Sequence, residues 1–166
     1  MEYKPNMKKS IGMIAGGSGI TPMIQVLTEI LKNPDDKTEV SLLFSNRTED
    51  DIIAKSQLDA AAAKYPNFKV KYVLSRPKDP SKWEEESGEK GHINADLIKK
   101  YIPAASDDTL IFVCGPPPFY VSISGDKDYS SSPPAQGVLD GTLKELGYDG
   151  KYQYIIFITI YYSSSS

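Results

Sequence analysis

Residues 10–23 read SIGMIAGGSGITPM, and this stretch decides the fold because a cluster of glycines joins a short apolar run to a helical pattern. Ile11 to Ala15 is apolar, short and bounded by a glycine, which predicts a buried strand. Thr21 is expected to cap the helix that follows, with Pro22 at its first position, where a missing N–H costs nothing. Apolar residues then recur at helical spacing, so one face of this helix should pack on a sheet.

The order of strand, glycine turn and helix presents free backbone N–H groups to an anionic ligand. Gly16, Gly17 and Gly19 would let phosphate oxygens approach the backbone closely. The turn is not the dinucleotide fingerprint G-x-G-x-x-G, because Pro22 stands where the third glycine would be. On these residues alone, a tight turn without a ligand is the alternative to a phosphate site.

The composition excludes several classes of function. The 166 residues suit one domain, and a net charge of −3 offers no basic excess for nucleic acid or an anionic membrane surface. One histidine and one cysteine cannot build a usual zinc site, so no metal is expected. The first residues carry no apolar signal segment, and the longest apolar run is too short to insert into a membrane.

Strands and helices alternate along the rest of the chain, which predicts an α/β domain. The expected architecture is an open, mostly parallel five-stranded sheet with helices on both faces and strand order 3-2-1-4-5. The later strands are expected at Glu39–Phe44, Phe68–Leu74, Thr109–Cys114 and Tyr152–Tyr162. The later helices are expected at Thr48–Tyr65, Asn94–Tyr101 and Val138–Leu146. Residues 76–90 and the Ser/Pro/Gly-rich residues 122–136 are expected as loops.

Two of the expected strands end in conspicuous loops, at Gly16 and at Cys114. In an open parallel sheet, ligands bind beyond the carboxyl ends of the strands where the strand order reverses. Strands one and four are neighbours at that point, so the glycine turn and the loop from Gly115 to Pro118 should face one crevice. Prolines have little freedom, and this loop would form a stiff wall. Without a ligand, Cys114 is simply a small apolar strand end.

Three motifs in order, GGSGITP at 16–22, FSNRTEDDI at 44–52 and CGPPP at 114–118, resemble the NADH-binding half of NADH–cytochrome b5 reductases. These enzymes belong to the ferredoxin–NADP reductase superfamily. The resemblance extends from about Tyr3 to Tyr148, and LKELGY at 143–148 is most similar to the fungal mitochondrial form. It implies that residues 1–166 are a single NAD(H)-binding domain. It also implies a mitochondrial location. Because these residues show no targeting or membrane-spanning segment, a cytoplasmic location is expected if the chain is expressed as given.

The resemblance implies hydride transfer from NADH to FAD, followed by single-electron transfer to cytochrome b5. It implies that Cys114 is the catalytic thiol beside the nicotinamide, and that Asp51 favours NADH by meeting the adenosine ribose. Thr21 would lie near the junction of flavin and nicotinamide. The cofactor-binding residues that it implies are Gly16, Gly17, Gly19, Thr21, Pro22, Asn46, Asp51, Cys114, Gly115, Pro116, Pro117 and Phe119.

The chain also departs from the family pattern. The family's flavin domain, with its Arg-x-Tyr-Ser/Thr motif, precedes this region and is missing from these residues. Phe119 stands where methionine is common, and residues 150–166 form an atypical C-terminal end. We therefore expect the isolated chain to bind no FAD and to need a flavin domain as its partner for turnover. A non-catalytic nucleotide-binding module, or a decayed or truncated paralogue, is the alternative.

Overall fold

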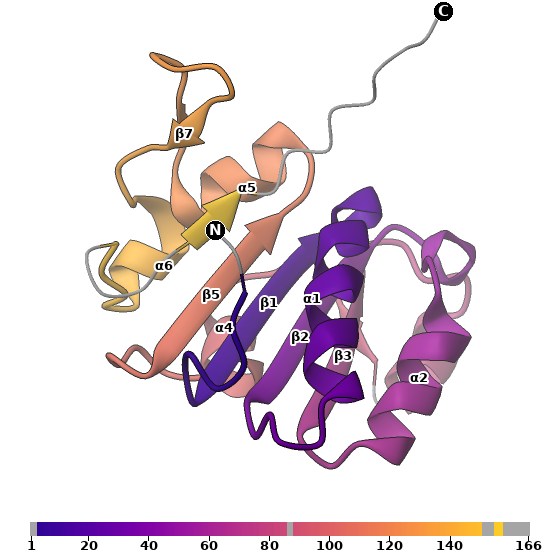
Figure 1. Cartoon of the computed structure of the whole chain (residues 1–166). Coiled ribbons are helices and arrows are strands. Elements are labelled where there is room, and N and C mark those ends of the chain that lie inside the picture. The colour runs from indigo at the N-terminus through magenta and orange to yellow at the C-terminus, as the bar shows by residue number, and fades with distance from the viewer. Residues whose placement is uncertain (1–2, 86–87, 151–154, 158–166) are drawn as a thin grey trace, which may run out of the picture.

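The computed structural model describes residues 3–85, 88–150 and 155–157, and its centre is a parallel sheet (Figure 1). The strand order is β4-β3-β2-β1-β5-β8. The strands are β1 (Ser10–Gly16), β2 (Glu39–Asn46), β3 (Phe68–Leu74), β4 (Glu89–Lys90), β5 (Thr109–Cys114) and β8 (Ile155–Phe157). The predicted α/β class and the order 3-2-1-4-5 are confirmed, as β3-β2-β1-β5-β8.

The strand β4 was not predicted. It consists of two charged residues that pair in parallel with the end of β3, at the outer edge of the sheet. A pair of charged residues has no apolar alternation, so the pattern that reveals longer strands is absent here. At the other edge, β8 lies within the strand expected at residues 152–162. The remainder of that expected strand lies outside the described residues.

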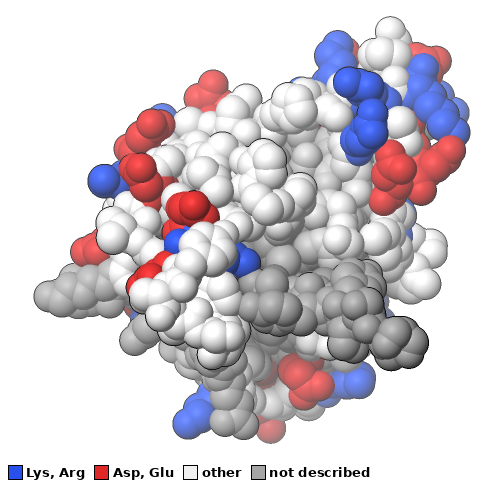
Figure 2. Space-filling view, turned by 90° about the horizontal axis from the view of Figure 1, so that it is seen from above, with Lys and Arg blue, Asp and Glu red and all other residues white. Residues whose placement is uncertain are grey.

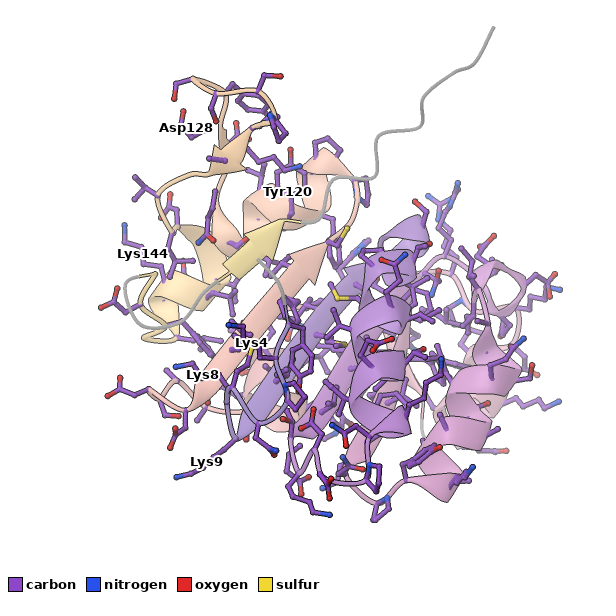
Figure 3. The ribbon with its side chains drawn as sticks, viewed as in Figure 1. Lys4, Lys8, Lys9, Tyr120, Asp128 and Lys144 are labelled. Carbon is purple, nitrogen blue, oxygen red and sulfur yellow. The ribbon has the colours of Figure 1, made fainter. Side chains whose placement is uncertain are left out.

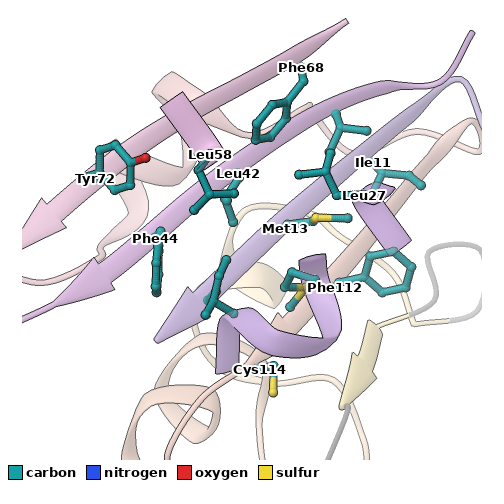
Figure 4. Close-up of a cluster of buried hydrophobic side chains, with 14 of the residues drawn as sticks. Ile11, Met13, Leu27, Leu42, Phe44, Leu58, Phe68, Tyr72, Phe112 and Cys114 are labelled. Carbon is teal, nitrogen blue, oxygen red and sulfur yellow. The ribbon is translucent and has the colours of Figure 1, made fainter. Parts of the chain in front are cut away.

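Helices cover both faces of the sheet. On one face lie α1 (Ile20–Lys32) and α2 (Lys55–Lys64), whose apolar side chains join the inward side chains of the strands (Figure 4). On the other face lie α4 (Ala95–Tyr101), α5 (Pro117–Ser124) and α6 (Gly141–Glu145). The short helix α3 (Pro80–Glu85) adds Trp83 to the first cluster. Because β1 is buried from both sides, its carboxyl end is held rigidly between the layers.

The start of α1 differs from the prediction. A single 3-10 turn, η1 (Gly17–Gly19), runs directly into the helix, and the N–H of Ile20 donates to the carbonyls of Gly17 and Ser18. The helix therefore begins at Ile20 with Gly19 as its N-cap, so Thr21 does not cap it. Pro22 is the third helical residue. It is still within the first turn, where a backbone N–H would have no partner inside the helix.

Three other predictions of local structure were wrong in part. The helix expected at 48–65 is split into η2 (Glu49–Asp51) and α2, because Ala54 between them is left-handed, with φ 56°. Residues 122–136 are not only a loop, since β6 (Lys127–Asp128) and β7 (Ala135–Gln136) form an antiparallel hairpin. The helix expected at 138–146 is shortened to α6. By contrast, the helix expected at Asn94–Tyr101 is confirmed as α4, with Asn94 as its N-cap, whose side chain accepts from the N–H of Leu97 at 3.0 Å.

Asp36 lies in the loop between α1 and β2, yet it is not a solvated turn residue. Its side chain is buried and accepts hydrogen bonds from the hydroxyls of Tyr3 and Thr38. Burial alone would raise the pKa of this carboxyl, but those hydrogen bonds outweigh it and hold the pKa below its usual value. The segment before β1 is thereby fastened to the loop between α1 and β2.

Candidate functional site

A cleft of about 1040 Å³ opens at the carboxyl ends of β1, β2 and β5. Figure 2 looks onto this end of the molecule, toward which the strand arrows of Figure 1 point, and the described residues near the middle of this view are mostly uncharged. After β1 the chain enters α1 on one face, and after β5 it enters α5 on the other face. Open α/β sheets bind their ligands at this position, where the connections from two neighbouring strands go to opposite faces of the sheet.

The glycine turn and the loop after β5 touch each other. A Cβ at Gly19 would lie 2.2 Å from the carbonyl oxygen of Cys114, a separation that only glycine permits. Gly17 has φ +53°, so the turn also uses the left-handed conformation that glycine adopts readily. The ring of Phe119 lies over both loops, because a Cβ would approach it to 3.1 Å at Gly16 and to 2.5 Å at Gly115. The two sequence motifs thus form one continuous surface.

Cys114 is the last residue of β5, and only 7% of it is exposed. Burial raises the pKa of its thiol, and the positive charge of Lys127 offsets part of that rise. The thiol is therefore protonated at neutral pH, because the pKa lies above its usual value. Such a group suits an uncharged wall that fixes a ligand, and it is unsuited to nucleophilic attack as a thiolate.

Asp51 projects from η2 at the opposite end of the cleft. Its Oδ2 accepts from the hydroxyl of Thr48 at 2.8 Å and from the N–H of Thr48 at 2.9 Å, so the carboxylate is held in place. These hydrogen bonds lower the pKa of Asp51, and the positive charge of Arg47 lowers it further. The carboxylate is thus fixed and ionised at neutral pH, beside a cation that also lines the cleft.

Asn46 is the last residue of β2 and lines the cleft between these two ends. Its backbone carbonyl accepts from the N–H of Ser75 at 3.1 Å. The residue is buried, with an exposed fraction of only 7%. Neither the amide nitrogen nor the amide oxygen has a hydrogen-bond partner among the residues that the structure describes. A buried polar group of this kind needs an explanation.

The cleft gathers nearly all the residues expected from the sequence. Those that line it are Gly16, Gly17, Gly19, Asn46, Asp51, Cys114, Gly115, Pro116, Pro117 and Phe119. Thr21 and Pro22 do not line it: Thr21 is exposed, Pro22 is buried, and both belong to α1. Their contact with a cofactor stays a prediction.

Sequence reasoning missed several lining residues, namely Ser75, His92, Lys127 and Tyr129. Ser75 follows β3 directly, so the rule about strand ends could have found it. Lys127 and Tyr129 belong to the β6–β7 hairpin region, which stands beside α5 (Figure 3). There the ammonium of Lys127 lies 4.8 Å from the ring centre of Tyr120, and the hydroxyls of Tyr120 and Tyr129 are 3.2 Å apart.

Known proteins resemble the chain in sequence. A family model described as "Oxidoreductase NAD-binding domain" matches residues 13–124. An NADH-cytochrome b5 reductase-like protein of Arabidopsis thaliana is 50% identical over 149 residues, which are 89% of this chain and 42% of that protein. NADH-cytochrome b5 reductase 2 of Scheffersomyces stipitis is 48% identical over 147 residues, 89% of this chain and 47% of that protein. The chain spans about half the length of the curated relatives it matches.

Solved structures resemble the chain as well. The cytochrome b5 reductase domain of Ulva prolifera nitrate reductase is 33% identical, with a TM-score of 0.70, and the match covers 90% of this chain and 50% of that one. The CS-b5R domains of human Ncb5or, in their NAD+ form, are 27% identical with a TM-score of 0.64, over 89% of this chain and 36% of that one. Within the described ranges, no helix combines the length and hydropathy needed to cross a bilayer.

Proposed function

Because the chain belongs to the oxidoreductase NAD-binding domain family, we propose that residues 1–166 are the NADH-binding half of a flavoprotein reductase. NADH supplies a hydride, FAD on a flavin domain accepts it, and single electrons pass to cytochrome b5. The observation that carries the proposal is the contact of Gly19 with Cys114, which joins the glycine turn and the cysteine loop in one cleft. The names of the relatives that are about 50% identical support the choice of NADH and of cytochrome b5.

The residues of the cleft fit such a dinucleotide. The glycine turn bears no charged side chain and leads into the positive end of the dipole of α1, which suits a pyrophosphate. Pro116, Pro117 and Phe119 would hold the flat nicotinamide ring against the protonated thiol of Cys114. Asp51 would accept hydrogen bonds from the adenosine ribose. The thiol would act by excluding water and fixing the position of the ring.

The proposal is tested by calorimetric titration of the purified chain with NADH, followed by reconstitution with the flavin domain of a relative. We expect binding of one NADH, no flavin absorption from the chain alone, and reduction of cytochrome b5 by NADH once the flavin domain is supplied. Failure to bind NADH would contradict the proposal. Binding without turnover in the reconstituted system would favour a non-catalytic nucleotide-binding module. The mitochondrial location stays a prediction.

Asp51 should make the chain prefer NADH to NADPH. The 2′-phosphate of NADPH carries roughly −1.5 to −2 charges and would face the fixed carboxylate. Arg47 beside it should soften this repulsion, so we expect a preference of about 1–3 kcal/mol. The variant Asp51→Asn keeps an acceptor for the N–H of Thr48 and removes the charge, and its preference should fall markedly in calorimetric titrations with both nucleotides.

The control for this prediction is Asp50→Asn. Asp50 is the preceding acid, it forms an ion pair with Lys78, and it is not among the residues that line the cleft. Its substitution should leave the preference for NADH nearly unchanged. If Asp51→Asn keeps the full preference, Asp51 serves only to cap η2.

A further inference from the structure

We infer that Lys127 is a specificity-determining residue that makes the cleft prefer NADH to NAD+. The inference rests on the proposed function and deepens it, because that function places the nicotinamide ring beside Cys114. Lys127 belongs to β6, is half-buried, and lines the same cleft as Cys114. Its ammonium group would therefore lie near the part of the dinucleotide whose charge changes in the reaction.

The fold holds the Lys127 ammonium at the Cys114 end of the cleft. The helix α5 follows the loop after Cys114, and the hairpin of β6 and β7 stands beside that helix (Figure 3). Tyr120 of α5 is buried, and the ammonium lies 4.8 Å from the centre of its ring, within the range of a cation–π contact. Burial raises the pKa of the Cys114 thiol, and the charge of Lys127 offsets part of this rise, so the two groups are close enough to interact.

Lys127 brings a positive charge to this end of the cleft. Among the described residues, the acidic and basic side chains that line the cleft are those of Arg47, Asp51 and Lys127. Arg47 and Asp51 have opposite charges and lie together at the other end, so their effects at a distance largely cancel. Asp126 accepts from the N–H of Lys127 at 2.7 Å, but Asp126 is exposed to solvent and does not line the cleft. The lining side chains thus leave the Cys114 end positive.

The two forms of the dinucleotide differ at the ring that would occupy this end. The reduced nicotinamide of NADH is neutral. After it gives up a hydride, which is one proton and two electrons, to the flavin, the ring carries a full positive charge. An ammonium group beside the ring repels the oxidised form and leaves the neutral form nearly unaffected. Lys127 should therefore weaken the binding of NAD+ relative to NADH, which favours entry of the substrate and release of the product.

The variant Lys127→Met removes the charge and keeps an unbranched side chain of similar length. We expect the ratio of the affinities for NADH and NAD+ to fall about 5-fold, the effect of one charge in a cleft open to solvent. ADP-ribose contains the same phosphates and no nicotinamide, so its affinity should change no more than that of NADH. Lys127→Arg keeps the charge and should keep the ratio of the parent.

The matched control is Lys144→Met, which removes the same charge from α6. Lys144 is exposed, forms an ion pair with Asp140, and is not among the residues that line the cleft. Its substitution should leave the ratio of the two affinities unchanged. Lys127→Gln repeats the test in case methionine alters the hairpin, and thermal unfolding checks that every variant is folded.

The closing experiment is calorimetric titration of the full chain and of each variant with NADH, NAD+ and ADP-ribose. If the parent binds NADH and the ratio is unchanged in Lys127→Met and Lys127→Gln, the inference is overturned and the proposed function stands. Equal gains in affinity for NAD+ and ADP-ribose would also overturn the inference, because ADP-ribose has no charged ring. A parent that binds no dinucleotide would contradict the proposed function, and the inference with it.

Discussion

Gly19→Ala should destabilise the fold by about 1–3 kcal/mol and weaken NADH binding roughly 100-fold. The new Cβ would stand 2.2 Å from the carbonyl oxygen of Cys114 and 2.8 Å from the backbone nitrogen of Gly115. Both are backbone atoms, so no side-chain rotation can relieve the clash, and the start of α1 must move away from the end of β5. Because the cleft is formed where these two segments meet, this movement would separate the glycine turn from the loop after β5. Denaturant unfolding and NADH calorimetry measure the two effects.

The matched comparison is Gly17→Asn. Gly17 is left-handed, with φ +53°, but nothing lies within 4 Å of the position its Cβ would take. Asparagine tolerates this conformation better than most residues. Its loss of stability should therefore be well below that of Gly19→Ala. If the two variants unfold and bind alike, the close approach to Cys114 is not what holds the site together.

Cys114→Ser should slow hydride transfer to the flavin of a supplied flavin domain by roughly 100-fold, while NADH affinity changes much less. The thiol is buried at the end of β5 and protonated, so its contribution is its volume and its uncharged surface. Serine is smaller and more polar, so the nicotinamide ring would lose the surface that sets its distance from the flavin. The measurement is flavin reduction after rapid mixing with NADH.

Two controls accompany this prediction. Cys114→Ala removes the volume without adding a polar group, so a similar slowing in alanine and serine would identify volume as the cause. Unfolding of both variants should stay close to that of the parent, because the residue lies at the edge of its buried cluster (Figure 4). An unchanged rate with a large loss of affinity would show that the thiol contributes only to binding.

The sheet could be predicted from the sequence because its buried strands are short, apolar and bounded by breakers. The expected strands Phe68–Leu74 and Thr109–Cys114 coincide with β3 and β5. The helix α5 was missed because consecutive prolines were interpreted as a loop, although Pro117 and Pro118 occupy the first helical positions, where proline is tolerated. Residue type alone does not distinguish a stiff loop from the start of a helix.

The site residues that lie at strand ends could be predicted from the sequence. Those that depend on the path of the chain between strands could not. Gly16, Asn46 and Cys114 end adjacent parallel strands, so topology alone brings them to one edge of the sheet. Lys127 reaches the cleft only because the chain after α5 turns back as a hairpin, which a composition rich in serine, proline and glycine does not reveal. Thr21 was misplaced because η1 advances the start of α1.

The two-residue strand β4 has a consequence for how copies of this protein meet. An exposed sheet edge recruits strands from other molecules, and short, charged edges resist this. Here Lys90 forms an ion pair with Glu84 at 2.7 Å, and Glu89 forms one with Lys100 at 2.8 Å. A neighbouring chain would find few free backbone groups and would have to displace these charges. Aggregation by addition of strands is therefore blocked on this side of the sheet, and concentrated solutions should not form fibrils from it.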